Sequence, residues 1–163
     1  MCSPISPSAP ATEFSRGVET FRFVGGRGTK RAADSSMERL FWIGLGGAVG
    51  SVARHGLSLW CHQRFGLSFP WGTLAVNVIG SLSLAAVMQV AISTSLLSET
   101  LRLALTTGVM GGFTTYSTFN YETTKLFQQG AWKTASLNVA VTLVACLCAG
   151  VLGAALARRV VGG

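Results

Sequence analysis

Four long apolar stretches follow one another in the second part of the chain. They occupy residues 40–60, 65–98, 103–121 and 134–157, and the last three contain no charged residue. Each is long enough for a bilayer-spanning helix, which needs about 20 residues. In lipid only helices and closed barrels satisfy the backbone hydrogen bonds, and the alternating pattern of barrel strands is missing. The pattern therefore predicts an all-α membrane protein with four transmembrane helices.

The third stretch is unusual because glycine and threonine crowd its middle. Residues 106–120 read TTGVMGGFTTYSTFN, and both residue types are mediocre helix formers. Gly111 and Gly112, followed by two threonines, predict a broken third helix. An unwound backbone at that depth is tolerated only where it is buried in protein or lines a polar cavity. Its free carbonyls could hold a cation.

Residues 1–36 differ in composition from the rest. They hold three of the four prolines, five basic residues and three acids, and they contain no apolar run of signal-peptide length. We expect a disordered tail, or a mis-assigned start with Met37 as the true first residue. Residues 37–163 form the membrane domain in either case.

Composition supports the membrane assignment. The chain is 49% hydrophobic and 12% charged, whereas soluble domains carry about 25% charged residues. The net charge of +7 does not indicate nucleic-acid binding, because the basic residues mostly flank the apolar stretches. The lipid bilayer is the partner that this composition predicts.

The basic residues of the membrane domain divide evenly between the two sides. Four spans put one set beside the chain ends and the other set opposite: Arg39, Arg102, Arg158 and Arg159 against Arg54, Arg64, Lys125 and Lys133. Orientation follows an excess of Lys and Arg on the cytoplasmic side, so a tie predicts insertion in both directions. Two opposed copies could then pair about an in-plane two-fold axis. The tail would change the count to nine against four.

The candidate chemistry is that of a pore and not of an enzyme. Residues 37–163 contain only three acids and two histidines, so catalytic constellations lack partners. The spans are rich in hydroxyls and amides, which can line an ion pore. Asn77 is equally compatible with a pore and with a bond between helices. Arg54 either reaches the interface, which we favour, or attracts anions at a vestibule. Tyr116 and Phe119 share a helix face, and their ring edges carry partial positive charge.

Three motifs together resemble the CrcB/Fluc fluoride channel family. They are GGAVGSVARH at 46–55, PWGTLAVNVIGS at 70–81 and TGVMGGFTTYSTF at 107–119. The resemblance implies an antiparallel, dual-topology homodimer with two fluoride pores in the inner or plasma membrane. It implies passive export of fluoride, which lowers the cytoplasmic concentration.

The resemblance also assigns residues. It implies that the fluoride pore is lined by Asn77, Tyr116, Ser117, Thr118, Phe119, Asn138 and Thr142, with Cys146 at the same spacing and Arg54 at a vestibule. The carbonyls of Gly111 and Thr114 would hold a structural sodium ion (Na+) that is not transported. Tyr116 stands where the family has phenylalanine, and Asn138 and Cys146 are also atypical.

Two other functions fit a small four-helix membrane protein. A multidrug exporter would need a glutamate in its first helix to couple protons to its substrates, and the first stretch has only Glu38 at its edge. A structural membrane subunit would transport nothing. Fluoride efflux from proteoliposomes, with chloride as the control, separates the three.

Overall fold

The computed structural model describes residues 28–162, and side chains from Ser35 onward. The elements are α2 (Gly28–Phe65), α3 (Trp71–Ser93), α4 (Glu99–Leu103), the π-helix η1 (Ala104–Met110), α5 (Gly111–Phe113), α6 (Tyr116–Gln128) and α7 (Trp132–Val161). No strand occurs among the described residues, which confirms the all-helical prediction. Ser35–Gly163 form one compact unit, and the description below concerns that unit.

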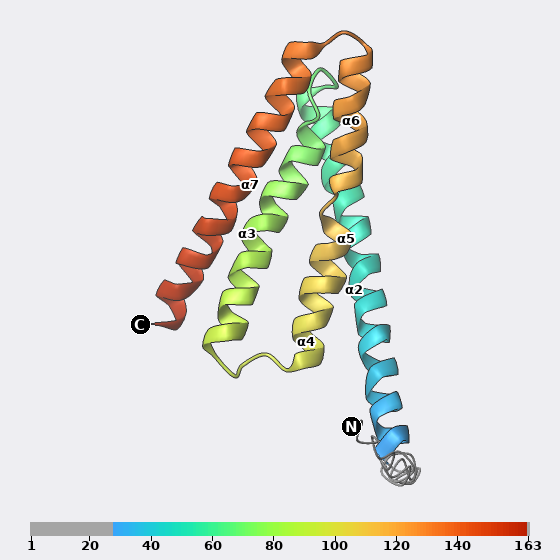
Figure 1. The fold of residues 1–163 in the computed structure, drawn as a ribbon, viewed down its shortest axis with the longest axis vertical. Coiled ribbons are helices and arrows are strands. Elements are labelled where there is room, and N and C mark those ends of the chain that lie inside the picture. Colours follow the sequence, from blue (N-terminus) through green and yellow to red (C-terminus); the bar gives the residue numbers. More distant parts are fainter. Residues whose placement is uncertain (1–27, 163) are drawn as a thin grey trace, which may run out of the picture. The chain divides into compact units, whose positions relative to one another are not determined.

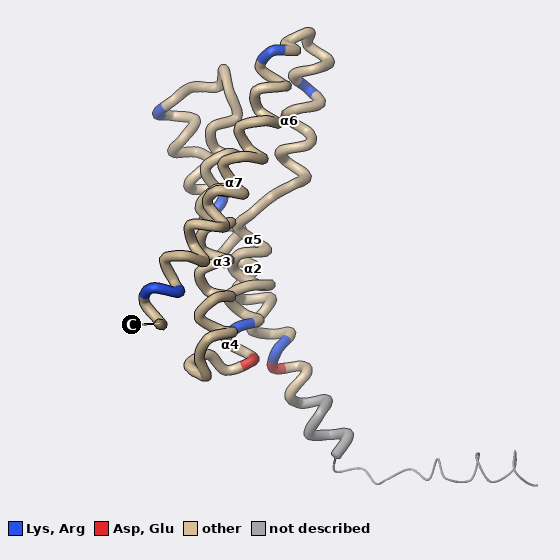
Figure 2. Tube along the Cα trace, turned by 60° about the vertical axis from the view of Figure 1, so that its left-hand side comes forward, with Lys and Arg blue, Asp and Glu red and all other residues tan. Residues whose placement is uncertain are grey.

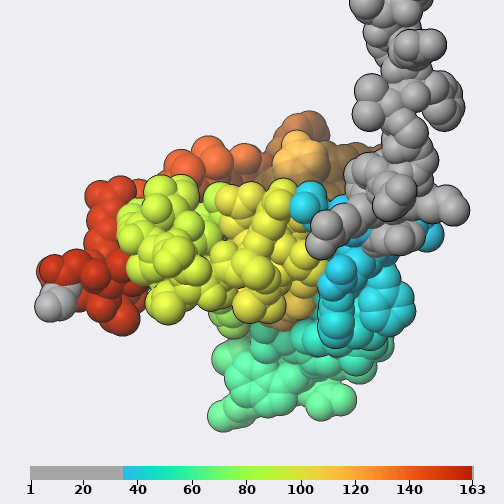
Figure 3. Space-filling model, turned by 90° about the horizontal axis from the view of Figure 1, so that it is seen from below, coloured from blue at the N-terminus to red at the C-terminus, as the bar shows by residue number. Residues whose placement is uncertain are grey.

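The unit passes four times from one end to the other (Figure 1). Helix α2 runs one way, α3 returns, the run from α4 to α6 goes back, and α7 returns again. The α2–α3 loop and the α6–α7 turn lie at one end, and the α3–α4 connection and the end of α7 lie at the other. Seen from that second end, α7 and α2 lie at opposite edges with α3 and α4 between them (Figure 3).

Two of the described helices, α3 and α7, are long and apolar enough to cross a membrane, with mean hydropathies of 1.9 and 2.5. Only 11% and 17% of their apolar windows are buried inside the single chain, whereas the core helix of a soluble protein would be mostly buried. The other two expected spans have less regular apolar sequences. Arg54 and His55 interrupt the apolar sequence of α2, although the helix itself is continuous. The third pass is divided into four elements.

Lys and Arg gather at the two ends of the unit and leave its middle nearly free of charge (Figure 2). At one end Arg39 and Glu99 form a bidentate ion pair with N···O distances of 3.1 and 2.8 Å, which joins α2 to α4. Arg158 donates from Nε to Oε1 of Gln89 at 3.1 Å, which joins α7 to α3. Such a distribution suits a chain whose ends meet water and whose middle meets lipid.

Glycines let the passes approach backbone to backbone. A Cβ on Gly46 of α2 would lie 2.6 Å from the carbonyl oxygen of Ala104, and one on Gly108 would lie 2.8 Å from that of Ile43. Gly153 of α7 packs in the same way on the backbone of Leu82 in α3. Small residues at helix contacts are typical of membrane bundles, because tight packing replaces the hydrophobic effect there.

The third pass leaves the helical conformation at two threonines. Helix α5 ends at Phe113, α6 begins at Tyr116, and between them Thr114 (φ −81°, ψ 157°) and Thr115 (φ −151°, ψ 112°) are extended. Gly111, one of the two glycines at which we expected a break, is helical with φ −63° and ψ −39°. Gly112 instead provides room for the carbonyl of Gly47 in α2. The β-branched threonines adopt the extended backbone that suits them better.

Helix α2 begins at Gly28 and therefore includes residues 28–36 of the stretch that we expected to be disordered. The remainder of that stretch, residues 1–27, lies outside the described residues.

Candidate functional site

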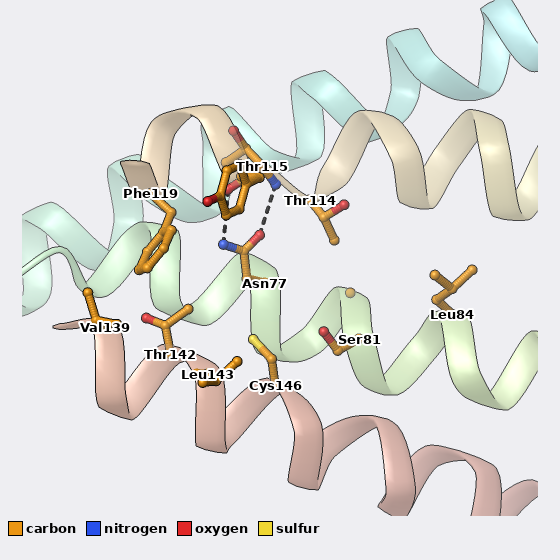
Figure 4. A pocket seen from close by; sticks show the side chains of 12 residues that line it. Asn77, Ser81, Leu84, Thr114, Thr115, Phe119, Val139, Thr142, Leu143 and Cys146 are labelled. Atoms are coloured by element: carbon orange, nitrogen blue, oxygen red, sulfur yellow. Dashed lines mark hydrogen bonds between the residues drawn. The ribbon is translucent and has the colours of Figure 1, made fainter. Parts of the chain in front are cut away.

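The extended segment between α5 and α6 is held by the amide of Asn77 on α3. Asn77 Nδ2 donates to the carbonyl oxygen of Thr115 at 3.1 Å, and the Thr115 N–H donates to Asn77 Oδ1 at 2.8 Å (Figure 4). The side chain thus pairs with both backbone groups of one residue that has left the helix. An amide nitrogen carries two N–H groups, so this pairing uses one and leaves a second for another partner. Asn77 therefore joins two helices, and it also faces the groove described below.

The hydroxyl of Thr115 organises the start of α6. Its Oγ1 accepts from the N–H of Thr118 at 3.1 Å, which is the bond of a helix N-cap. It also donates to Thr118 Oγ1 at 2.9 Å and lies 3.2 Å from Ser117 Oγ. Three hydroxyls are therefore gathered within one turn, beside the break.

The break also diverts the donors of two carbonyls. In an uninterrupted helix, the Thr115 N–H would bond to the carbonyl of Gly111, and the Thr118 N–H to that of Thr114. Here the first donates to Asn77 and the second to the hydroxyl of Thr115. The carbonyls of Gly111 and Thr114, to which the family resemblance assigns a sodium ion, have thus lost their usual helical donors. Hard oxygen donors of this kind fit an alkali cation.

A groove of about 490 Å³ lies between α3, α7 and the extended segment (Figure 4). Four predicted pore residues line it: Asn77, Tyr116, Phe119 and Thr142. Its other lining residues are Gly80, Ser81, Leu84, Thr114, Thr115, Val139, Leu143 and Cys146. Most of this second set is not among the pore residues predicted from the sequence. Helical spacing is the signal that could have found them, because the α3 and α7 members recur every three or four residues.

The two aromatic rings at the groove lie close together. The ring centroids of Tyr116 and Phe119 are 5.9 Å apart and their planes are inclined by 48°. Tyr116 is 77% exposed in the single chain, whereas Phe119 is half-buried. A tilted pair of this kind presents ring edges, which carry partial positive charge.

Two other predicted residues, Arg54 and Thr118, line a second cavity. This cavity of about 290 Å³ is lined by Ser51, Arg54, His55, Ser58, His62, Thr73, Thr115, Thr118 and Glu122. Thr115 lines both cavities, so it forms part of the wall between them. Arg54, the predicted vestibule residue, thus lies in a polar pocket with other charged and titratable groups. Among them, Glu122 has a buried Oε2 atom without a hydrogen-bond partner.

Asn138 and Ser117 are absent from the linings of both cavities. Asn138 is 1% exposed, and its Nδ2 donates to Thr123 Oγ1 at 2.8 Å. The hydroxyl of Thr142 donates to Asn138 Oδ1 at 3.4 Å. The family resemblance implies a pore position for Asn138; in the structure its side chain lies between α6 and α7 and bonds to both helices.

Comparison with known proteins identifies the family. The model of the family described as "CrcB-like protein, Camphor Resistance (CrcB)" matches residues 41–154. A "Fluoride-specific ion channel FluC" of Sorangium cellulosum (strain So ce56) is 63% identical over 127 residues, which cover 78% of this chain and all of that protein. Proteins with the same description from Geobacter sulfurreducens (strain ATCC 51573 / DSM 12127 / PCA) and Anaeromyxobacter sp. (strain K) are 50% and 47% identical. Their alignments cover 68% and 77% of this chain, and 90% and 100% of those proteins. These matches and the apolar helices show that the chain is a membrane protein that belongs to the CrcB family.

Proposed function

We propose that this chain is a fluoride channel, as the descriptions of its relatives say of them. The observation that carries the proposal is the groove beside the helix break. It brings the amide of Asn77, the hydroxyl of Thr142 and the edges of two aromatic rings to one apolar-walled space. These groups come from three passes of the chain and share one use, which is to offer partial positive charge to a small anion.

Fluoride demands such groups because it is small and strongly hydrated. Removing its water is costly unless other donors replace the lost hydrogen bonds. The second N–H of Asn77 is one such donor. The hydroxyls of Ser117 and Thr118 gather at the break, and ring edges supplement them. Arg54 in the neighbouring polar pocket attracts the anion toward this region.

A second, antiparallel copy of the chain completes the channel in this proposal. Tyr116 and Leu143 line the groove yet are 77% and 60% exposed in the single chain, so an apolar partner is needed to close it. Tied basic residues on the two sides favour insertion in both orientations. Two such copies form the dual-topology homodimer that the sequence predicts.

The same pairing provides a place for a structural sodium ion. Each copy contributes the carbonyls of Gly111 and Thr114, whose helical donors are directed elsewhere. Two copies about a two-fold axis would bring four such oxygens together, and a hard cation prefers oxygen ligands. The ion fixes the broken helices against each other and is not transported.

Passive conduction, with no coupled ion, gives export whenever cytoplasmic fluoride exceeds the outside concentration. In the inner or plasma membrane this flow protects the cell. A proton-coupled exporter of cationic drugs is disfavoured because α2 has no acidic residue after Glu38. Glu38 is exposed and lies near the N-terminal end of that helix.

Efflux from liposomes tests this function. The purified chain is reconstituted into vesicles loaded with potassium fluoride or potassium chloride, a potassium ionophore is added to carry the compensating charge, and release is followed with ion-selective electrodes. We expect rapid fluoride release and chloride release at the level of empty vesicles. Equal release of both anions, or of neither, would contradict the proposal.

A further inference from the structure

A chain of three hydrogen bonds runs behind the groove from α7 to α6. The hydroxyl of Thr142 donates to Asn138 Oδ1 (3.4 Å), Asn138 Nδ2 donates to Thr123 Oγ1 (2.8 Å), and the hydroxyl of Thr123 donates to the carbonyl of Phe119 (2.7 Å). Every bond points in the same direction. Asn138 and Thr123 each accept one bond and donate the next, Asn138 through two different atoms of its amide and Thr123 through its single hydroxyl.

The residues at the two ends of this series of hydrogen bonds line the groove, and the two in its middle do not. Thr142 and Phe119 line the groove, whereas Asn138 and Thr123 do not. Asn138 is 1% exposed and Thr123 is 7% exposed. The buried pair therefore contacts a groove residue on each side without reaching the groove itself.

We propose that Asn138 is a positioning residue for fluoride conduction, which acts with Thr123 to hold Phe119 and Thr142 in register across the groove. The inference rests on the proposed function, and it replaces direct contact of Asn138 with the ion. Hydrogen bonds in a buried network fix geometry because an unpaired group there is costly. A ring edge and a hydroxyl that serve a small ion need such fixing, since small displacements weaken contacts with the ion.

The longest of the three hydrogen bonds is the one made by the hydroxyl of Thr142, the group at the groove that would have to turn toward an ion. The Thr142 bond to Asn138 is 3.4 Å long, well beyond the usual O–H···O length of about 2.7–2.8 Å. The hydroxyl of Thr142 can therefore turn from Asn138 to an anion at little cost. When the anion leaves, the hydroxyl of Thr142 donates to Asn138 Oδ1 again. The groove residues therefore keep their positions between the passage of one ion and the next.

A double-mutant cycle tests the pairing of Asn138 with Thr123. We compare Asn138→Leu, Thr123→Val and the double variant with the unmodified chain, each purified and reconstituted as the full-length protein. Fluoride efflux is measured per folded protein, and thermal unfolding is followed in parallel. The matched control is Thr124→Val, the same change one residue along α6 at an exposed position.

We expect each single variant to conduct about tenfold less fluoride, the order of effect of one lost buried hydrogen bond. The double variant should be no worse than either single one, because the two residues act through one bond. Thr124→Val should conduct normally. Additive losses, normal flux in Thr123→Val, or flux losses that merely follow the loss of folded protein would each overturn the proposal.

A pH profile gives a readout that simple loss of packing would not move. A buried carboxyl favours its protonated form, and in that form Asn138→Asp can still accept from Thr142 and donate to Thr123. We expect its flux, relative to the unmodified chain at the same pH, to be near normal in acid and to fall as pH rises. Asn138→Leu should stay low throughout. A flat profile for Asn138→Asp would overturn the proposal.

Two references keep this test separate from the proposed function. The titratable groups of the neighbouring segments include Tyr116, Tyr121, Glu122 and Lys125 on α6, Lys133, Cys146 and Cys148 on α7, and His62 on α2. The unmodified chain contains all of them. Its own pH profile therefore removes their effects, and release from empty vesicles removes leakage of hydrogen fluoride. Failure of the unmodified chain to release fluoride would overturn the channel itself, and this inference with it.

Discussion

At the residue scale, Asn77 links the helix break to the groove. Its amide pairs with the N–H and the carbonyl of Thr115 and still faces the space that we assign to fluoride. From the sequence, a pore role and a bond between helices are equally compatible alternatives for Asn77. The structure describes the bond, and the groove lining allows the pore role beside it. One amide can serve both because its nitrogen carries two N–H groups.

Asn77→Asp should reduce fluoride efflux at least about tenfold, since a half-buried carboxylate without a paired charge is costly and repels an anion. The change removes the donor to the Thr115 carbonyl and sets a second oxygen against it. Efflux from liposomes measures the effect. Gln128→Glu, the same change at an exposed residue near the α6–α7 turn, is the control and should conduct normally. Unchanged flux in Asn77→Asp would rule out Asn77 as a pore residue.

At the element scale, the described structure depends on close contact between α2 and the third pass. The glycine-rich third stretch predicts a break at Gly111 and Gly112, because both are weak helix formers. In the structure, however, Gly112 gives room to the backbone of α2. The extended residues are instead the two threonines that follow, Thr114 and Thr115. Which of these roles a glycine serves depends on what packs against it, and a single sequence does not contain that information.

Gly46→Ala should destabilise the protein by about 1–3 kcal/mol, the usual cost of overpacking. Its new methyl group would lie 2.6 Å from the carbonyl oxygen of Ala104. Gly44→Ala, two residues away on the same helix, meets nothing within 4 Å and should be neutral or slightly stabilising. Thermal unfolding in detergent compares the two variants. Equal unfolding temperatures would contradict the described contact between α2 and the third pass.

Thr115→Val should destabilise the protein by about 1 kcal/mol through loss of the N-cap of α6, and it should also reduce flux. The hydroxyl that it removes bonds to the N–H and the hydroxyl of Thr118. Thr115→Ser keeps that hydroxyl and should retain most of both properties. Unfolding temperature and efflux are measured on the same preparations, and a Ser variant as impaired as the Val variant would contradict the cap.

The ion pair of Arg39 and Glu99 should contribute little to stability despite its good geometry. Its side chains are 38% and 55% exposed, and exposed pairs contribute about 0–1 kcal/mol. We expect Glu99→Gln to shift the unfolding temperature by no more than a few degrees, with less effect in high salt. A large loss of stability would show that α4 depends on this pair.

At the scale of the whole molecule, the even division of basic residues predicts insertion in both orientations. Reporter domains fused to the C-terminus of residues 37–163 should be found on both sides of the membrane. The full chain, with the five basic residues of its first 36 positions, should favour ends in the cytoplasm. A single orientation for residues 37–163 would contradict the opposed homodimer.

The four passes and much of the groove were predictable, because hydropathy and helical spacing are local properties of the chain. The place of Asn138 was not. Its spacing fits a pore-facing series on α7, but its amide instead bonds to Thr123, which lies 15 residues earlier on another helix. Only the packing of α6 on α7 determines whether such an amide faces the groove or a neighbouring helix.

Passive conduction of fluoride moves charge, so electrical control of efflux provides a test of it. Vesicles loaded with potassium fluoride and containing the chain are diluted into a fluoride-free solution, where charge separation should halt fluoride release almost at once. Adding a potassium ionophore removes that restraint, and we predict immediate, rapid fluoride release, with no response from vesicles loaded with potassium chloride. Fluoride release that is already complete without the ionophore, or that stays at the level of empty vesicles after it is added, would contradict passive fluoride conduction.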